Sequence, residues 1–211
     1  MDKATRDAVA ELRGAPQDAG GFRSARRLTG TEQSNLRLFF GDALDSTKVR
    51  LHTHTFSKDT AFCIDNRIFF PKPLFKADFG LSDPQNPGSS TDDDKVNLAW
   101  LFHECCHAWQ FQNKVRGYRW YKALLEQIKY GDATYDYDIE EKDCFADYRF
   151  EQQGQILQDY VYWYLLEGTH PQGAQRFRTV LACSLPIGPS VAAPATIDRR
   201  LPDWRKRLTR Y

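Results

Sequence analysis

Two histidines four residues apart, with a glutamate between them, are the residues of this sequence best suited to chemistry. His103, Glu104 and His107 lie in the stretch LFHECCHAWQFQ. On a helix, residues four apart lie one turn above each other, so both imidazoles can bind one zinc ion. Glu104 lies to one side, where its carboxylate can take a proton from a water molecule that the zinc acidifies. The motif therefore predicts a zinc site that hydrolyses a bond.

The alternative is a pair of core histidines whose ring nitrogens bond to carbonyl groups. The helix expected around the motif is apolar on most sides, and burying two unpaired histidines and a glutamate there would be unfavourable. Cys105 lies on the far side of that helix and cannot share a metal with His103. Cys106 lies near the histidines and could be a soft metal ligand, but small buried thiols are common in cores. We expect both cysteines to be packing residues.

A catalytic zinc ion needs a third protein ligand. Glu151 is favoured, because its helix is expected to place it on a polar stripe, but spacing alone leaves other candidates open. That stripe contains Cys144, Tyr148, Glu151, Gln155 and Tyr162. The other candidate ligands are Glu140, Glu141, Asp143, Asp147, Asp159, His170, His52 and His54. Tyr135, Tyr137 and Tyr148 are candidates for cleft walls or for donors to developing negative charge, although packing is their default role.

Two long helices must hold these residues. The first is predicted over about 95–113, with Thr91 or Asp92 as its cap and two aspartates in its first turn. The second is predicted over about 142–167 and carries Glu151. The remaining predicted elements are a helix over 2–13, a helix capped by Thr31 that ends near Gly41, a strand over 48–56, a hairpin turning at Asp65 and Asn66, a flexible loop over 81–95 and a short helix after Pro171.

Together these elements predict one α+β domain of zincin-like type, with two long helices meeting at a zinc ion and a small antiparallel sheet lining the cleft. The domain is expected to span residues 1–211, with 1–27 as an N-terminal extension and 184–211 as a basic tail broken by prolines. A length of 211 residues suits a single domain with a real core.

The composition bears on the classes of partner and on the compartment in which the protein is made. The formal net charge is +1, so neither nucleic acid nor an acidic membrane is a default partner. No stretch is long and apolar enough to predict a membrane span, and the charged N-terminus does not resemble a Sec signal. The five cysteines are irregularly spaced, which predicts reduced thiols in a protein made in a cytoplasm.

Several stretches between Leu28 and Leu166 match a known family. They are FFGDALDSTKVRL, NRIFFP, LFHECCHAWQFQ, YDYD and FEQQGQILQDY. In these the sequence resembles the Vgr-related zinc metallopeptidases, which include the C-terminal peptidase-like domain of some VgrG spike proteins of bacterial type VI secretion. The resemblance implies that His103, His107 and Glu151 bind Zn²⁺ and that Glu104 is the general base.

The resemblance also implies an antibacterial effector with a peptide or protein substrate, a secretion-spike carrier and an immunity protein as partners. Such a protein would be made in the bacterial cytoplasm and delivered into a target cell, with the periplasm as one candidate compartment. The family usually has a bulky residue and a threonine where Cys105 and Cys106 stand, and tends to alanine at Gly154. Neither departure removes a ligand.

Two other hypotheses compete with the peptidase. The first is a catalytically silent zinc-stabilised module for binding or delivery, which a fourth ligand from Cys106, His52 or His54 would favour. The second is a cysteine hydrolase using Cys106, which is disfavoured because adjacent residues on one helix cannot easily form a nucleophile and base pair.

Overall fold

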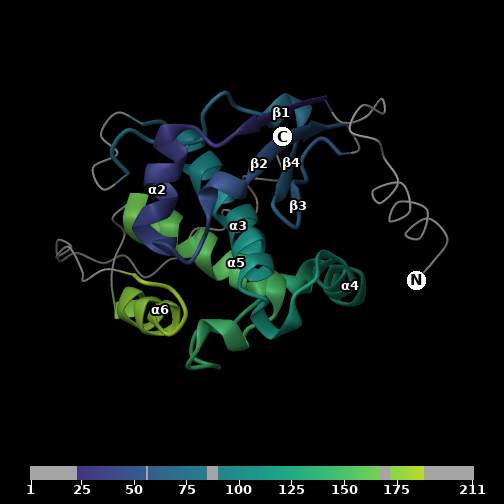
Figure 1. Cartoon of the computed structure of the whole chain (residues 1–211). Coiled ribbons are helices and arrows are strands. Elements are labelled where there is room, and N and C mark those ends of the chain that lie inside the picture. Colours follow the sequence, from purple (N-terminus) through teal and green to yellow (C-terminus); the bar gives the residue numbers. More distant parts are fainter. Residues whose placement is uncertain (1–22, 56, 85–89, 167–171, 188–211) are drawn as a thin grey trace.

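The computed structural model describes residues 23–55, 57–84, 90–166 and 172–187. Within these ranges, four strands form one sheet, and there are five α-helices. In Figure 1 the sheet lies at the upper right, with α2 to its left and the other α-helices below. The elements are β1 (Arg23–Arg27), α2 (Gly30–Phe40), β2 (Arg50–His54), β3 (Phe62–Ile64), β4 (Arg67–Pro71), α3 (Asp92–Gln112), α4 (Trp120–Tyr130), α5 (Phe150–Asp159), a π-helical continuation of α5, named η6 (Tyr160–Leu166), and α6 (Gln172–Ala182).

The sheet has the order β1-β2-β4-β3, and the predicted α+β class is confirmed. The expectation of a wholly antiparallel sheet was wrong in one pairing, because β2 and β4 run parallel while the other two pairs are antiparallel. The predicted hairpin forms between β3 and β4, with Asp65 and Asn66 at its turn. After β2 the chain reverses direction to form β3, which is the edge strand of the sheet. It then reverses again to form β4, which lies between β3 and β2. β4 must therefore point the same way as β2.

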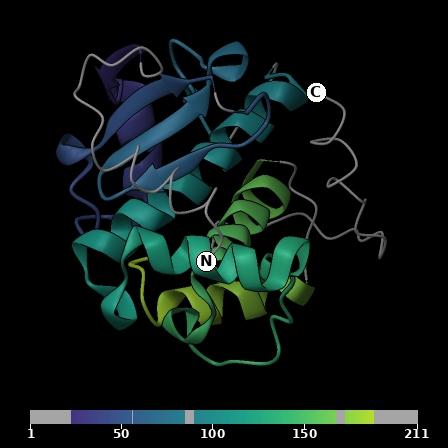
Figure 2. The same cartoon turned by 90° about the vertical axis from the view of Figure 1, so that its right-hand side faces the viewer.

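Helix α3 is the centre of the fold. Figure 2 shows it in teal, running diagonally between the sheet on one side and α4, α5 and α6 on the other. It packs against β3 and β4 and most extensively against α5. A capping box begins the helix, since Thr91 accepts from the backbone N–H of Asp94 and the Asp94 carboxylate accepts from that of Thr91. Because α3 has the sheet on one side and α5 on the other, every residue from 101 to 110 is buried, polar ones included.

The second helix begins later than predicted. Residues 142–149 are not α-helical and include only a 3₁₀ turn, η5 (Phe145–Asp147). The Tyr148 carbonyl accepts from Gln153 and from Arg116 instead of from a helical N–H. Cys144 and Tyr148 therefore do not share a helical stripe with Glu151, which lies in the first turn of α5.

Helix α2 is capped by Thr29 and not by Thr31 as predicted, and it ends at Gly41 as expected. Thr29 accepts from the backbone N–H of Glu32, and the Glu32 carboxylate in turn accepts from that of Thr29. Glu32 is fully buried and also accepts two hydrogen bonds from Arg26 and one from the backbone N–H of Phe79. This carboxylate fastens β1 and the segment before α3 to the start of α2.

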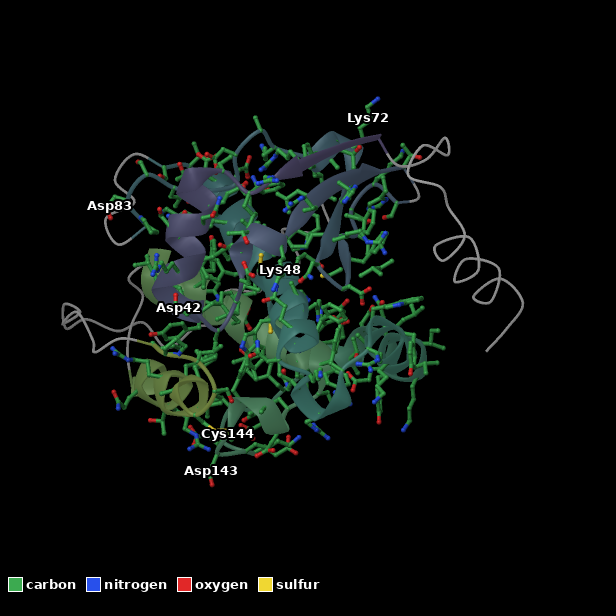
Figure 3. The ribbon with its side chains drawn as sticks, in the orientation of Figure 1. Asp42, Lys48, Lys72, Asp83, Asp143 and Cys144 are labelled. Atoms are coloured by element: carbon green, nitrogen blue, oxygen red, sulfur yellow. A yellow bond between two sulfur atoms is a disulfide. The ribbon has the colours of Figure 1, made fainter. Side chains whose placement is uncertain are left out.

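One pair of cysteines forms a disulfide, so the prediction of five reduced thiols was wrong. Cys144 joins Cys183 near the end of α6, with the two Cα atoms 5.4 Å apart. Figure 3 labels Cys144 beside α6, with Asp143 pointing away from the protein. The two cysteines are 39 residues apart, and only the return of α6 onto η5 brings them together. Cys63, Cys105 and Cys106 are free and buried, as expected for Cys105 and Cys106.

Some predictions lie outside the described residues, namely the helix over 2–13, His170 and most of the tail. The tail's first residues are described, and Leu185 is buried in the core while Pro186 lies against Gly41. The short helix predicted after Pro171 is confirmed as α6. Within the described ranges, no helix combines the length and apolar character that a membrane span requires.

Candidate metal centre

The structure brings together His103, His107 and Glu151, the three residues favoured as zinc ligands. Glu151 Oε2 lies 3.4 Å from His103 Nε2 and 3.5 Å from His107 Nε2. All three side chains are buried, and their ligand atoms lie within 4.8 Å of one another. Ligands of a tetrahedral zinc ion at ~2.0–2.1 Å lie roughly 3.3 Å apart. Two nitrogens and one carboxylate oxygen at these separations could hold such an ion.

Packing of α3 on α5 sets this geometry. The two histidines are one turn apart on the face of α3 that meets α5. Glu151 is held at the start of α5, where the Glu126 carboxylate of α4 accepts from the backbone N–H of Phe150 at 3.0 Å. Gly154 lies under the His103 ring, and a Cβ at that position would be 2.7 Å from Nε2. The absence of a side chain at Gly154 lets the two helices approach this closely.

Without a metal ion, the Glu151 carboxylate and the His107 imidazole would form an ion pair. Burial alone would raise the pKa of Glu151, but the His107 and His103 imidazoles outweigh it and hold that pKa well below its usual range. Burial lowers the pKa of His107, yet the Glu151 carboxylate more than compensates and raises that pKa to about 9. A metal ion would take the place of the proton that His107 shares with Glu151.

Glu104 lies beside the ligands without joining them. Its side chain is 3% exposed, and its Oε2 has no hydrogen-bond partner among the described residues. Burial raises the pKa of Glu104, the neighbouring histidines lower it, and the net direction is upward. A buried carboxylate with an unused oxygen next to a possible metal site can accept a proton from a water molecule there.

Comparison with known proteins identifies a relative. No protein-family model matches the sequence. The type VI secretion system spike protein VgrG2b of Pseudomonas aeruginosa is 31% identical over 165 residues, which are 72% of this chain and 14% of VgrG2b. The solved effector domain of VgrG2b matches with a TM-score of 0.55 and 28% identity, over 83% of this chain and 89% of that domain. The chain is homologous to the VgrG2b effector domain.

The match to VgrG2b is therefore a match to one domain, because this chain spans only a small part of the full spike protein. The solved effector domain of VgrG2b is covered almost throughout, which supports the fold described above. At 28% identity the two domains share their architecture, while contacts of individual side chains must be taken from this structure.

Among the described residues, none of the other candidate ligands joins the three-residue group, and His170 lies outside those residues. Glu140 and Asp143 form exposed ion pairs with Arg176. His54 bonds to the Thr60 carbonyl through Nε2, and His52 stacks on Phe69. Glu141 and Asp147 are exposed, and Asp159 accepts from Tyr137 and Gln155. His54 is buried, and the Phe62 ring packs against it.

Of the three predicted tyrosines, only Tyr135 lies beside the ligands. Its ring centre is 6.0 Å from that of His103, and its hydroxyl accepts from Gln127. Burial, followed by the Glu151 and Glu104 carboxylates, raises the pKa of Tyr135, so the phenol keeps its proton. Tyr148 donates instead to the Asp138 carbonyl and acts in packing.

Three further residues around the ligands escaped prediction. Tyr118 stacks on His107 with ring centres 6.0 Å apart and planes at 13°. Gln110 and Gln153 form a buried amide pair that reaches the Nδ1 atom of His107. A polar residue three positions after a ligand histidine, in an otherwise apolar helix, was the available signal for Gln110. Tyr118 follows a loop and left no comparable signal.

Proposed function

We propose that this chain is a zinc-dependent peptidase that acts as an effector of type VI secretion. The observation that carries the chemical part is the buried group of His103, His107 and Glu151, with Glu104 beside it. The observation that carries the biological part is homology to the VgrG2b effector domain.

The two histidines and Glu151 would hold Zn²⁺ and leave one coordination position open. A zinc ion in such a site acidifies a water molecule and polarises the carbonyl of the bond to be cleaved. Glu104 would accept the proton of that water and deliver it to the leaving amine. Tyr135, which keeps its phenolic proton next to His103, would donate a hydrogen bond to the developing negative charge on the carbonyl oxygen.

The ligand set favours catalysis over a structural zinc. Structural sites have four protein ligands, whereas the group found within the described residues has three. Cys106 does not belong to the group of possible ligands found within the described residues. Burial raises the pKa of its thiol, which argues against a cysteine nucleophile.

Delivery by a secretion spike would explain both the relative and the disulfide. The relative's name describes a spike protein, so a secretion spike is the expected carrier. An immunity protein is the further partner that the proposed effector role implies. A Cys144–Cys183 bond is stable in an oxidising compartment and not in the cytoplasm where the chain is made. We therefore infer the periplasm of a target cell as the place of action.

The test compares four proteins for zinc content and for cleavage of a mixed peptide library. These are wild type, Glu104→Gln, Glu151→Ala and the control Glu141→Gln, whose carboxylate is exposed. We expect Glu104→Gln to keep its zinc and to cleave at least about 100-fold more slowly, because it lacks the base. Glu151→Ala should lose most of its zinc, while Glu141→Gln should match wild type. Equal cleavage by Glu104→Gln with equal zinc would refute the mechanism, and zinc binding without any cleavage would favour the silent module.

A further inference from the structure

A pair of buried amides connects His107 to the start of α5. Gln110 is fully buried, and its Oε1 lies 2.8 Å from Nδ1 of His107. Its Nε2 donates to the Phe150 carbonyl at 2.9 Å and to Oε1 of Gln153 at 2.8 Å. Gln153, also fully buried, donates through Nε2 to the Tyr148 carbonyl at 2.8 Å. The connection therefore runs from backbone carbonyls, through two side-chain amides, to one imidazole.

Backbone carbonyls determine the orientation of both amides. A carbonyl oxygen can only accept, so the group of Gln153 that faces Tyr148 must be its NH₂. The oxygen of Gln153 then faces Gln110. The group of Gln110 that faces both this oxygen and the Phe150 carbonyl must in turn be its NH₂. Reversing either amide would set nitrogen against imidazole or oxygen against oxygen in a buried site, which is strongly unfavourable.

The same logic reaches His107. With Oε1 of Gln110 fixed toward the imidazole, Nδ1 must carry a hydrogen to donate across the 2.8 Å contact. With the Nδ1 hydrogen held by Gln110, the proton that His107 shares with Glu151 must be the one on Nε2, so Nε2 becomes the unprotonated atom when a metal ion replaces that proton. Nε2 is the atom that lies 3.5 Å from Glu151 Oε2. The fixed amides thus present a lone pair at the position where a metal ion would bind.

We propose that Gln110 is a positioning residue that fixes His107 as the Nδ1–H tautomer and so prepares Nε2 for a metal ion. The proposal rests on the proposed function only in naming zinc as the ion. Gln110 acts on both helices, because its second contact is to Phe150, the residue before Glu151. His103 differs, since its Nδ1 has no hydrogen-bond partner among the described residues. Of the two histidines, His107 is therefore the one whose Nδ1 is hydrogen-bonded within the described residues, and loss of Gln110 should act through it.

The proposal is tested by the zinc dissociation constant of three variants, measured by chelator competition. Gln110→Leu removes both the acceptor for His107 Nδ1–H and the donor to the start of α5. We expect this variant to bind zinc about 10–100-fold more weakly. When ionised, Gln110→Glu keeps an acceptor for Nδ1–H but has no donor for the Phe150 carbonyl or for Oε1 of Gln153. It should bind zinc nearly as wild type does while unfolding more easily. Gln112→Leu is the control, because Gln112 on the same helix bonds to Asp45 and Asn66, away from the ligands. It should leave zinc binding unchanged.

Two results would overturn the proposal. Equal zinc affinity in Gln110→Leu and wild type would exclude any positioning role. Equal loss in Gln110→Leu and Gln110→Glu would mean that Gln110 only joins the helices and does not control the tautomer.

Nitrogen-15 NMR of wild type gives an independent reading that requires neither a folded variant nor zinc. In the zinc-free protein at a pH where His107 is neutral, its hydrogen should be on Nδ1. Finding it on Nε2 would overturn the proposal even if the peptidase is real. Finding it on Nδ1 in a protein that cleaves nothing would leave the proposal standing while the peptidase function fails.

Discussion

Removing the Cys144–Cys183 disulfide should destabilise the zinc-free protein by about 4 kcal/mol at most. The bond closes a loop of 39 residues, and the entropy that such a cross-link removes from the unfolded chain corresponds to roughly that free energy at 25 °C. For a chain of this size, 1 kcal/mol shifts the midpoint of thermal unfolding by about 2–4 °C, so a loss near 10 °C is expected. The closed loop contains α5 and α6, and hence Glu151.

The assay is urea unfolding of the zinc-free protein with and without a reductant, for wild type and for the double variant Cys144→Ser/Cys183→Ser. Reductant should lower the stability of wild type to that of the variant and should leave the variant unchanged. The variant is thus the control for effects of the reductant on the buried thiols. A thiol count in denaturant should give three free thiols in wild type before reduction, those of Cys63, Cys105 and Cys106.

Two results would refute this reasoning. Five free thiols in oxidised wild type would mean that the bond does not form. A formed bond whose reduction leaves the urea midpoint unchanged would mean that the loop is already restricted in the unfolded chain.

Three further predictions follow from buried groups. Glu32→Ala should destabilise the fold by about 3 kcal/mol in urea unfolding, because it removes the carboxylate partner of Arg26 and the acceptor for the Thr29 and Phe79 N–H groups; a change below about 1 kcal/mol would contradict this. Gly154→Ala should weaken zinc binding about tenfold by displacing the His103 ring, with Gly30→Ala as an unhindered control; an unchanged dissociation constant would show that the ring can retreat. In zinc-free protein, the raised pKa of His107 contributes to the free energy of unfolding, and this contribution is fully present below pH 6.5 and is lost as the pH rises through about 9. The lowered pKa of Glu151 contributes in the same way, and its contribution is fully present above pH 4.5. The melting temperature of wild type should therefore exceed that of Glu151→Gln most between pH 4.5 and pH 6.5. A difference in melting temperature that grows toward alkaline pH would contradict the ion pair.

The part of the site that could be predicted is the part that one helix encodes. His103 and His107 are four residues apart, and any helix through them puts both rings on one face. The capped helix itself was predictable from Thr91 and the aspartates that follow. The placement of Glu151 needed a second helix, and its expected start was eight residues too early. The stripe argument still selected Glu151, because Gln155 and the residues after it do lie on the same helix.

Features that depend on residues distant in sequence could not be predicted in the same way. The parallel pairing of β2 with β4 follows from the order in which strands join the sheet, and no alternation of residues records that order. The Cys144–Cys183 bond depends on where α6 returns, and its cysteines lie 39 residues apart in no known spacing. Thr31 and Thr29 are both plausible caps by type. Only the burial of Glu32, which Arg26 and Phe79 surround, makes Thr29 the cap.

The amide pair lies between these two cases. Gln110 stands one turn after His107, so the contact to Nδ1 is local and could in principle be inferred. Its orientation could not be inferred, because the carbonyls of Phe150 and Tyr148 determine which end of each amide faces the histidine. The ligands of the candidate metal centre are thus specified by short spacing along α3. The hydrogen-bonding state of one of them is specified by the chain 40 residues later. A substitution near the start of α5 can therefore change metal binding without touching any ligand.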